Sequence, residues 1–251
     1  MAKRRADQLL VDRALADSRS RAQALIMAGV VFSGERKILK AGDTLADDAP
    51  LEVRGKDHPW VSRGGLKLAH AIEEFGLELN NKVVLDVGAS TGGFTDVALA
   101  NGAARVYAVD VGHGQLAWKL RQDERVVVLE RTNARYLTDA EIPEAVDVIV
   151  CDASFIGLET VLPAPMALGG AGALLVALIK PQFEVGKGRV GKGGVVRDPA
   201  LHDEVCTRIR DWLQGLPDWS VVDITPSPIL GPEGNREFLI YARKQVDVSA
   251  V

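Results

Sequence analysis

Three charged residues, Asp110, Asp152 and Lys180, end apolar runs of the kind that form buried parallel strands. The runs cover residues 105–110, 146–152 and 173–180. Ligands of open α/β sheets bind outside the carboxyl ends of the strands, so we expect these three side chains at one site. Lys180 carries the most information, because a lysine that ends a buried strand is costly unless an acid pairs with it.

A glycine-rich turn lies between a short apolar strand and the start of a helix. The turn, Gly-Ala-Ser-Thr-Gly-Gly-Phe-Thr, spans residues 88–95 and follows the apolar residues 83–87. Its glycines let a ligand approach the backbone, and the unpaired N–H groups of the helix start favour a nucleoside or phosphate. Asp110 ends the next strand, where a carboxylate can accept both ribose hydroxyls of an adenosine. The pattern indicates adenosine binding and leaves the cofactor open between NAD and S-adenosylmethionine (SAM).

The last two predicted strands, at 219–224 and 237–243, distinguish between these cofactors. Residues 225–236 join them and contain three prolines and two glycines. A parallel connection needs a crossover helix, which this segment cannot form, so we expect the last strand to be antiparallel. Rossmann-type dehydrogenase sheets are usually all parallel, whereas a seven-stranded mixed sheet with an antiparallel last strand is typical of SAM-dependent methyltransferases. We therefore predict a Rossmann-like α/β fold of this methyltransferase class.

The other elements of this larger domain follow from apolar periodicity. We expect a strand at 126–129 and helices at 63–75, 115–121, 156–168 and 199–216. Ser62 can cap the first of these helices, and Pro163 and Pro165 should make the third one irregular.

Residues 1–58 predict a small α+β domain, which a linker at 59–62 separates from the larger domain at 63–245. Pro59 blocks a helix across the linker. Within the small domain, Ser18 can cap the second of two short helices, and Gly29 can end it. The helices are expected at 6–16 and 19–28, and the strands at 30–32, 36–38 and 51–54.

The small domain is basic, whereas the rest of the chain is acidic. Residues 1–40 contain nine lysines and arginines and four acids, a net charge of +5. The whole chain has a net charge of −4, so the other 211 residues carry −9. A basic domain on an acidic body indicates contact with a polyanion. The alternative is a solvated basic face on a protein-docking module.

Cysteine, histidine and apolar usage exclude several classes of protein. Cys151 and Cys206 form no CxxC pair, and the four histidines show no metal-ligand spacing. The longest apolar run, at 167–179, is too short and glycine-rich to cross a bilayer, and charges interrupt any N-terminal signal region. We expect a cytoplasmic monomer with no metal, no disulfide and no membrane segment.

Four segments resemble the TlyA family. They are Asp-Val-Gly-Ala-Ser-Thr-Gly-Gly-Phe-Thr at 86–95, Asp-Val-Gly-His-Gly-Gln-Leu at 110–116, Lys-Pro-Gln-Phe-Glu at 180–184 and Gly-Asn-Arg-Glu-Phe at 234–238. The small domain resembles the S4 RNA-binding domain through Arg5-Ala6-Asp7, Ser18-Arg19-Ser20-Arg21 and residues 28–34. Members of this family join an S4 domain to a methyltransferase domain similar to that of the FtsJ/RrmJ ribose 2′-O-methyltransferases.

The resemblance implies a catalytic tetrad of Lys67, Asp152, Lys180 and Glu237. Taken alone, Lys67 would be interpreted as an ordinary solvated lysine. A ribose 2′-hydroxyl is a poor nucleophile near neutral pH, so the enzyme must share or remove its proton while presenting it to the methyl group of SAM. Lys180 is expected to be the base or to orient the hydroxyl. Burial and Lys67 favour its neutral form, Asp152 and Glu237 favour its charged form, and the sequence leaves this balance open.

Other residues are assigned to the cofactor. Strand-end geometry and the resemblance together place the glycine-rich turn around the methionine part of SAM and Asp110 on its ribose. Asn133 is the candidate for the adenine, with an ordinary surface loop as the alternative, and His113 and Gln115 are further candidates. The cofactor set is Asp86, Gly88, Ala89, Ser90, Gly92, Gly93, Phe94, Asp110, Asn133 and Asp152.

RNA binding is assigned to lysines and arginines in two places. Arg5, Arg19 and Arg21 should project from neighbouring helix starts and neutralise phosphates. The glycine-rich segment 186–194 should be mobile and close over RNA. The full set is Lys3, Arg4, Arg5, Arg19, Arg21, Arg36, Lys187, Arg189 and Lys192.

The function that the resemblance implies is SAM-dependent 2′-O-methylation of cytidine riboses in 16S rRNA, 23S rRNA or both, within ribosomal subunits. Two alternatives stay open. The family has also been labelled haemolysin, but the sequence shows no spanning helix, signal region or strongly cationic amphipathic helix. The chain can also be an RNA-binding assembly factor with a vestigial cofactor site, against which the intact tetrad argues.

Overall fold

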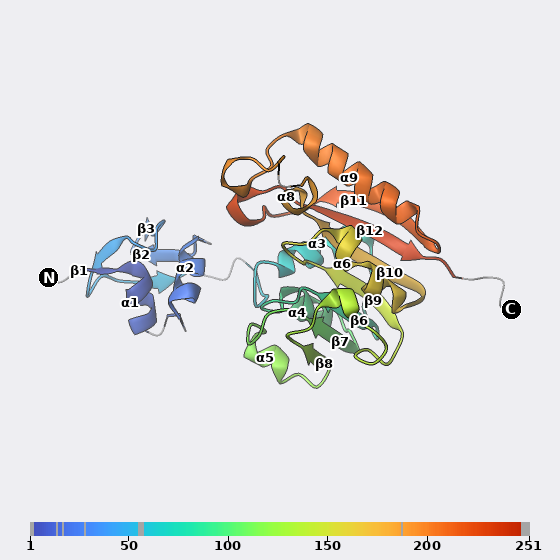
Figure 1. The fold of residues 1–251 in the computed structure, drawn as a ribbon. Coiled ribbons are helices and arrows are strands. Elements are labelled where there is room, and N and C mark those ends of the chain that lie inside the picture. The colour runs from blue at the N-terminus through green and yellow to red at the C-terminus, as the bar shows by residue number, and fades with distance from the viewer. Residues whose placement is uncertain are drawn as a thin grey trace. The chain divides into compact units, whose positions relative to one another are not determined.

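The computed structural model describes residues 3–246, with the exception of 14, 17, 28, 55–57 and 187. The chain forms two compact units, Met1–Pro59 and Trp60–Val251 (Figure 1). The second unit contains the seven-stranded sheet.

The first unit packs two short helices against short antiparallel strands. Its elements are β1 (Lys3–Arg5), α1 (Ala6–Asp12), α2 (Arg19–Met27), β2 (Val31–Ser33), β3 (Arg36–Lys37), β4 (Thr44–Ala46) and β5 (Glu52–Val53). β2 pairs with β3 and β5, and β1 pairs with β4. Ser18 Oγ accepts a hydrogen bond from the N–H of Arg21 at 3.2 Å, as expected of a cap, and Gly29 follows α2 with a φ of +70°. Leu9, Leu10 and Ile26 lie in the buried core.

A mixed sheet in the order β11-β12-β10-β9-β6-β7-β8 forms the centre of the second unit. The strands are β6 (Val83–Val87), β7 (Arg105–Val109), β8 (Val126–Leu129), β9 (Val146–Cys151), β10 (Gly169–Ile179), β11 (Trp219–Pro226) and β12 (Phe238–Lys244). β12 is antiparallel to both of its neighbours, and the other pairs are parallel. The predicted seven-stranded sheet with an antiparallel last strand is confirmed.

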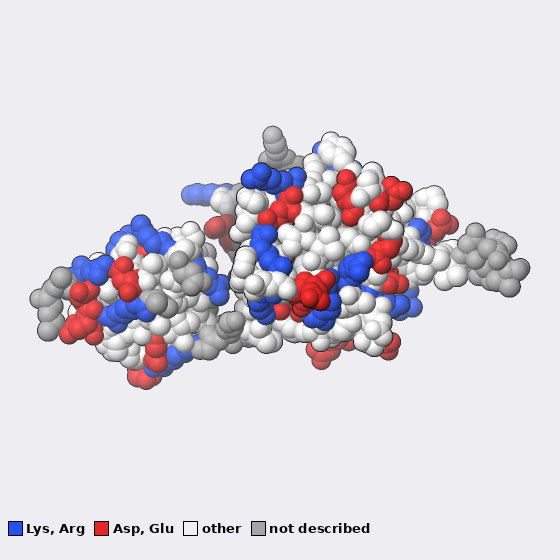
Figure 2. Space-filling view, turned by 90° about the horizontal axis from the view of Figure 1, so that it is seen from below, with Lys and Arg blue, Asp and Glu red and all other residues white. Residues whose placement is uncertain are grey.

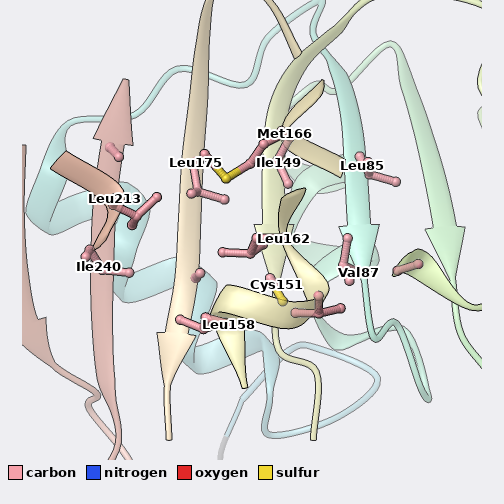
Figure 3. Packing of buried hydrophobic residues seen from close by; sticks show 14 of the residues in the cluster. Leu85, Val87, Ile149, Cys151, Leu158, Leu162, Met166, Leu175, Leu213 and Ile240 are labelled. Atoms are coloured by element: carbon pink, nitrogen blue, oxygen red, sulfur yellow. The ribbon is translucent and has the colours of Figure 1, made fainter. Parts of the chain in front are cut away.

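Helices cover both faces of the sheet. Neighbouring residues along a strand point to opposite faces, so each face has its own apolar cluster. Val84 lies in one apolar cluster with residues of α3 (Gly65–Phe75), α4 (Gly93–Ala100) and α5 (Trp118–Arg121). Leu85 lies in the other, with residues of α6 (Leu158–Val161), α7 (Pro163–Ala167) and α9 (Pro199–Gln214). Figure 3 shows Leu158 and Leu162 of this second cluster beside the strand residues that they cover. Each such side chain contributes about 1.5–3 kcal/mol when it is fully buried.

Four predicted helices differ from the structure. The helix expected at 6–16 is shorter, because α1 ends at Asp12. Ser62 does not cap α3, which begins at Gly65 without a side-chain cap. The helix expected at 115–121 is reduced to α5, and that at 156–168 is divided into α6 and α7. The division follows from Pro163, which begins α7 and cannot continue a preceding helix. None of the helices that the structure describes combines the length and the apolar character needed to cross a membrane.

Candidate active site

A pocket lies at the carboxyl edge of the sheet, where the loops after β6, β9 and β10 meet the start of α3. It is lined by Ser62, Arg63, Gly64, Lys67, Gly88, Ala89, Ser90, Thr91, Gly93, Phe94, Asp152, Ser154 and Lys180. The pocket therefore places three members of the predicted tetrad next to the predicted cofactor turn.

The four residues of the tetrad form one connected cluster of charges. Asp152 contacts both lysines: its Oδ1 lies 2.7 Å from Lys180 Nζ and 3.1 Å from Lys67 Nζ. Glu237 Oε2 lies 2.7 Å from Lys67 Nζ and so extends the cluster. Lys67, Lys180 and Glu237 are at most 6% exposed. The cluster contains two basic and two acidic side chains, so each buried charge has a partner of opposite sign.

The antiparallel direction of β12 brings Glu237 to this cluster. Phe238, the first residue of β12, pairs with Ile179, the last residue of β10. Glu237 and Lys180 therefore flank this pair at the same edge of the sheet. A parallel last strand would place its first residue at the opposite edge, so the antiparallel return completes the tetrad.

Three oxygen atoms surround the amine of Lys180. Its Nζ lies 2.7 Å from Asp152 Oδ1, 2.9 Å from the Asp152 carbonyl oxygen and 3.0 Å from Ser154 Oγ. A charged lysine can donate to all three, whereas a neutral amine would donate to the Asp152 oxygens and accept from the Ser154 hydroxyl. The Ser154 hydroxyl therefore takes the third hydrogen-bonding position around the Lys180 amine.

Gly88 and Asp110 shape the cofactor turn. A Cβ atom at Gly88 would lie 2.8 Å from Ala153 Cα, and φ is +83°, so glycine allows the turn to approach the loop that carries Asp152. Asp110 Oδ2 accepts a hydrogen bond from the N–H of Ser90 at 2.8 Å, and its Oδ1 accepts one from Gly112 at 2.6 Å. Each carboxylate oxygen can accept a second hydrogen bond. Asp110 therefore holds the turn in place and keeps acceptor capacity for a ribose.

Besides Asp110, described above, three further residues of the predicted cofactor set are absent from the pocket lining. Asp86 is fully buried inside β6, where its Oδ2 accepts a hydrogen bond from Thr95 Oγ1 at 2.7 Å, so it has no surface to offer a ligand. A Cβ atom at Gly92 would collide with Leu116 and Leu120. Asn133 is exposed and caps a 3₁₀ turn, Ala134–Tyr136, by accepting a hydrogen bond from Arg135 N–H at 3.1 Å. These positions indicate packing and capping roles.

Asp86 makes the stability of the second unit depend on pH. Burial raises the pKa of Asp86 to about 7, well above the ordinary carboxyl value of about 4. Between these values the folded state binds more protons than the unfolded chain, so stability falls as pH rises through this window. We expect Asp86→Asn to gain stability relative to wild type between about pH 5 and pH 8, by roughly 4 kcal/mol at most. Urea unfolding at both pH values measures this gain, and a difference that does not change with pH would contradict it.

The predicted RNA-binding residues are exposed or half-buried, and several contact acids. The pairs are Arg5 and Arg19 with Asp7, Arg4 with Asp12 and Asp47, Arg36 with Asp43, and Arg189 with Glu204. Lys3, Arg21 and Lys192 are exposed, and Lys187 lies outside the described residues. Figure 2 shows positive and negative side chains interspersed over the visible face of each unit.

Two residues that the sequence analysis did not assign tie the loops after β9 and β10 together. Ser154 contacts Lys180, as described above. Glu184, at the end of α8 (Pro181–Glu184), accepts hydrogen bonds from Leu158 N–H at 2.8 Å and from Arg208 Nη2 at 2.7 Å. Their position in the sequence could have identified them as candidates for the site, since each follows a predicted strand end by two to four residues.

Asn235 holds the end of the segment 186–194 in place. Its Oδ1 accepts a hydrogen bond from Val196 N–H at 3.1 Å, and its Nδ2 donates one to the Gly194 carbonyl at 3.0 Å. Asn235 is 3% exposed and precedes Glu237 by two residues. The end of the segment at Gly194 is therefore hydrogen-bonded to a buried residue that lies two positions before Glu237.

Comparisons with known proteins agree with this geometry. Residues 60–244 match the family model described as FtsJ-like methyltransferase. The chain is 49% identical over 249 residues to the 16S/23S rRNA (cytidine-2′-O)-methyltransferase TlyA of Mycobacterium tuberculosis, covering 98% of this chain and 92% of that protein. It is 41% identical over 243 residues to Hemolysin A of Brachyspira hyodysenteriae, covering 94% and 98%. A solved structure of a provisionally named hemolysin from Streptococcus thermophilus is 40% identical with a TM-score of 0.77, covering 100% and 93%.

Proposed function

The chain belongs to the FtsJ-like methyltransferase family, and we propose that it is a SAM-dependent ribose 2′-O-methyltransferase of ribosomal RNA. The observation that carries the proposal is the cluster of Lys67, Asp152, Lys180 and Glu237 beside the glycine-rich turn. The name of the Mycobacterium tuberculosis relative describes it as a cytidine-2′-O-methyltransferase of 16S and 23S rRNA. We extend this substrate class, cytidine riboses in one or both ribosomal subunits, to this chain.

The residues at the pocket fit SAM. The turn that contains Gly88, Ala89 and Ser90 lines the pocket, and Asp110 keeps acceptor capacity at the next strand end. When bound, SAM supplies a methyl group on a positively charged sulfur. The turn would hold its methionine part, and Asp110 would hold its ribose.

The charged cluster fits the hydroxyl substrate. Asp152 fixes both lysines, and Glu237 balances Lys67. Lys180 then orients the ribose hydroxyl, or takes its proton, at the position that Ser154 Oγ occupies in the free protein. Phe155, which is 88% exposed next to Ser154, suits stacking on a nucleobase of the same nucleotide.

The proposal is tested with SAM labelled on its methyl group and with purified small and large ribosomal subunits. We expect label on a 2′-hydroxyl of at least one subunit, located by primer extension that is sensitive to ribose methylation. No transfer to either subunit, with SAM binding intact, would overturn the proposal and leave a non-catalytic RNA-binding assembly factor as the explanation. Two relatives carry hemolysin names, but no observation on the described residues favours lysis over methyl transfer.

Within this proposal, the basic residues of the segment 186–194 contact RNA and not SAM. We expect Lys192→Gln to weaken binding to ribosomal subunits by about 3–10-fold at low salt, because it removes a phosphate contact. SAM affinity should stay unchanged. Lys82→Gln is the matched control, since Lys82 directly precedes β6 at the opposite edge of the sheet. Co-sedimentation measures the affinity for ribosomal subunits, and calorimetry measures the affinity for SAM. A loss of SAM binding in Lys192→Gln would contradict the prediction.

A further inference from the structure

The first unit contains a buried carboxylate, Asp7, that the proposed reaction does not use. Asp7 is 0% exposed and lies in the first turn of α1. Its Oδ1 accepts a hydrogen bond from Arg5 Nε at 2.9 Å. Its Oδ2 accepts hydrogen bonds from Arg5 Nη2 at 3.0 Å, Arg19 Nη2 at 3.1 Å and Gln23 Nε2 at 3.1 Å. One carboxylate therefore gathers side chains from β1 and α2.

The two arginines remain open to solvent above this carboxylate. The side chains of Arg5 and Arg19 are 50% and 54% exposed, whereas that of Asp7 is 0% exposed. Each guanidinium has five N–H groups, and the contacts with Asp7 use two from Arg5 and one from Arg19. The carboxylate of Asp7 is thus shielded from solvent, whereas the guanidinium groups of Arg5 and Arg19 are accessible and have unused N–H donors.

Fixing the two arginines in advance favours the binding of an anion. A free arginine loses about 2 kcal/mol of side-chain entropy when it is held in one conformation. Contacts that fix the side chain beforehand reduce this cost at the moment of binding. Hydrogen bonds from Arg5 also hold the pKa of Asp7 well below its ordinary range, so the carboxylate stays charged.

We propose that Asp7 is a positioning residue, which holds Arg5 and Arg19 as a preformed pair of donors for one phosphate of the RNA backbone. The inference rests on the proposed function, because that function supplies the RNA. It assigns the first unit of the chain a defined phosphate site in place of a diffuse basic surface. An ordinary structural ion pair, which only joins β1 to α2, is the competing explanation.

Asp7→Asn separates positioning from net charge. The substitution makes the chain more positive by one charge, so electrostatic attraction alone predicts tighter RNA binding. Loss of the aligned pair predicts the opposite, and we expect about tenfold weaker binding. Asp12→Asn is the matched control, because Asp12 lies on the same helix, contacts Arg4 at the surface and carries the same charge. We expect its affinity to equal or exceed that of wild type.

Binding is measured with the full chain and purified small and large ribosomal subunits, by co-sedimentation at several salt concentrations. The plot of log affinity against log salt concentration has a negative slope. In Asp7→Asn this slope should be less steep by about one, because one phosphate contact is lost. Protease sensitivity within residues 1–59 shows whether the first unit stays folded.

Arg5→Lys decides the question if Asp7→Asn unfolds the first unit. It keeps the charge but loses the two-point contact with Asp7, so we expect several-fold weaker binding. Arg54→Lys is the control, because Arg54 lies in the same unit, pairs with Glu35 and Glu52 and is not among the predicted RNA-binding residues; it should bind like wild type. Wild-type affinity in folded Asp7→Asn or in Arg5→Lys would overturn this inference. The proposed function would still stand if the wild-type protein transfers methyl groups. Absence of wild-type transfer to either subunit would instead overturn the proposed function.

Discussion

We expect Lys180→Met to slow methyl transfer by about 100-fold to 10,000-fold. This is the range over which general acid–base groups contribute to catalysis. Methionine fills a similar volume without the charge, so the pocket keeps its shape. The variant loses the contacts of the amine with Asp152 and Ser154, at the position where the substrate hydroxyl should lie. SAM affinity should change by no more than about twofold, because the glycine-rich turn is untouched.

Lys119→Met is the control for this prediction. Lys119 Nζ lies 2.8 Å from Asp96 in the same unit, and Lys119 does not line the pocket. Single-turnover assays with labelled SAM measure transfer, and thermal unfolding verifies the fold. Transfer at the wild-type rate by folded Lys180→Met would contradict the assignment.

Lys180→Arg separates the two roles that Lys180 can have. Arginine donates hydrogen bonds but stays protonated, so it cannot take the proton of the hydroxyl. An inactive Lys180→Arg would favour a base, whereas partial activity would favour a residue that only orients the substrate.

The sequence predicted the parts of the site that depend on strand ends. Asp152 and Lys180 follow apolar runs of parallel strands, and such strands end at a common edge. The direction of β12 was predictable because residues 225–236 cannot form a crossover helix. The pairing of β12 between β10 and β11 was not, since it depends on contacts between distant segments. Lys67 and Glu237 needed the family resemblance, because neither follows the carboxyl end of an apolar run.

Three differences between prediction and structure have identifiable physical reasons. Asp86 is the fourth residue of β6, so its side chain points toward α4 and not beyond the end of the strand. Ser62 does not cap α3, because the chain makes a turn at 62–65 in which the Ser62 carbonyl accepts a hydrogen bond from Gly65. β1 was missed because Lys3–Arg5 has no apolar alternation and pairs with residues about 40 positions later.

Asp152→Asn should reduce transfer at least as strongly as Lys180→Met. Asp152 is the acid that contacts both lysines, with oxygen–nitrogen distances of 2.7 and 3.1 Å. Asparagine keeps the size but leaves Glu237 as the only acid of the cluster beside the two buried lysines. Removing one partner of a buried ion pair costs about 3–5 kcal/mol, so we also expect lower stability in urea unfolding.

Glu237→Gln provides the graded comparison with Asp152→Asn. Glu237 contacts Lys67 at 2.7 Å and lies outside the pocket lining. We therefore expect it to position Lys67, and expect a rate between those of wild type and Asp152→Asn. Equal losses in the two folded variants would instead place Glu237 at the reacting atoms.

The double variant Lys67→Met/Glu237→Gln separates the effects on stability and catalysis. It removes one charge of each sign, and replacing a whole buried pair by uncharged groups is often neutral for stability. We expect its unfolding free energy to exceed that of Glu237→Gln, while transfer stays below that of Glu237→Gln because Lys67 is missing. If stability and transfer recovered together, the tetrad would act only as a structural ion pair. If stability alone recovered, Lys67 would be needed for the chemistry itself.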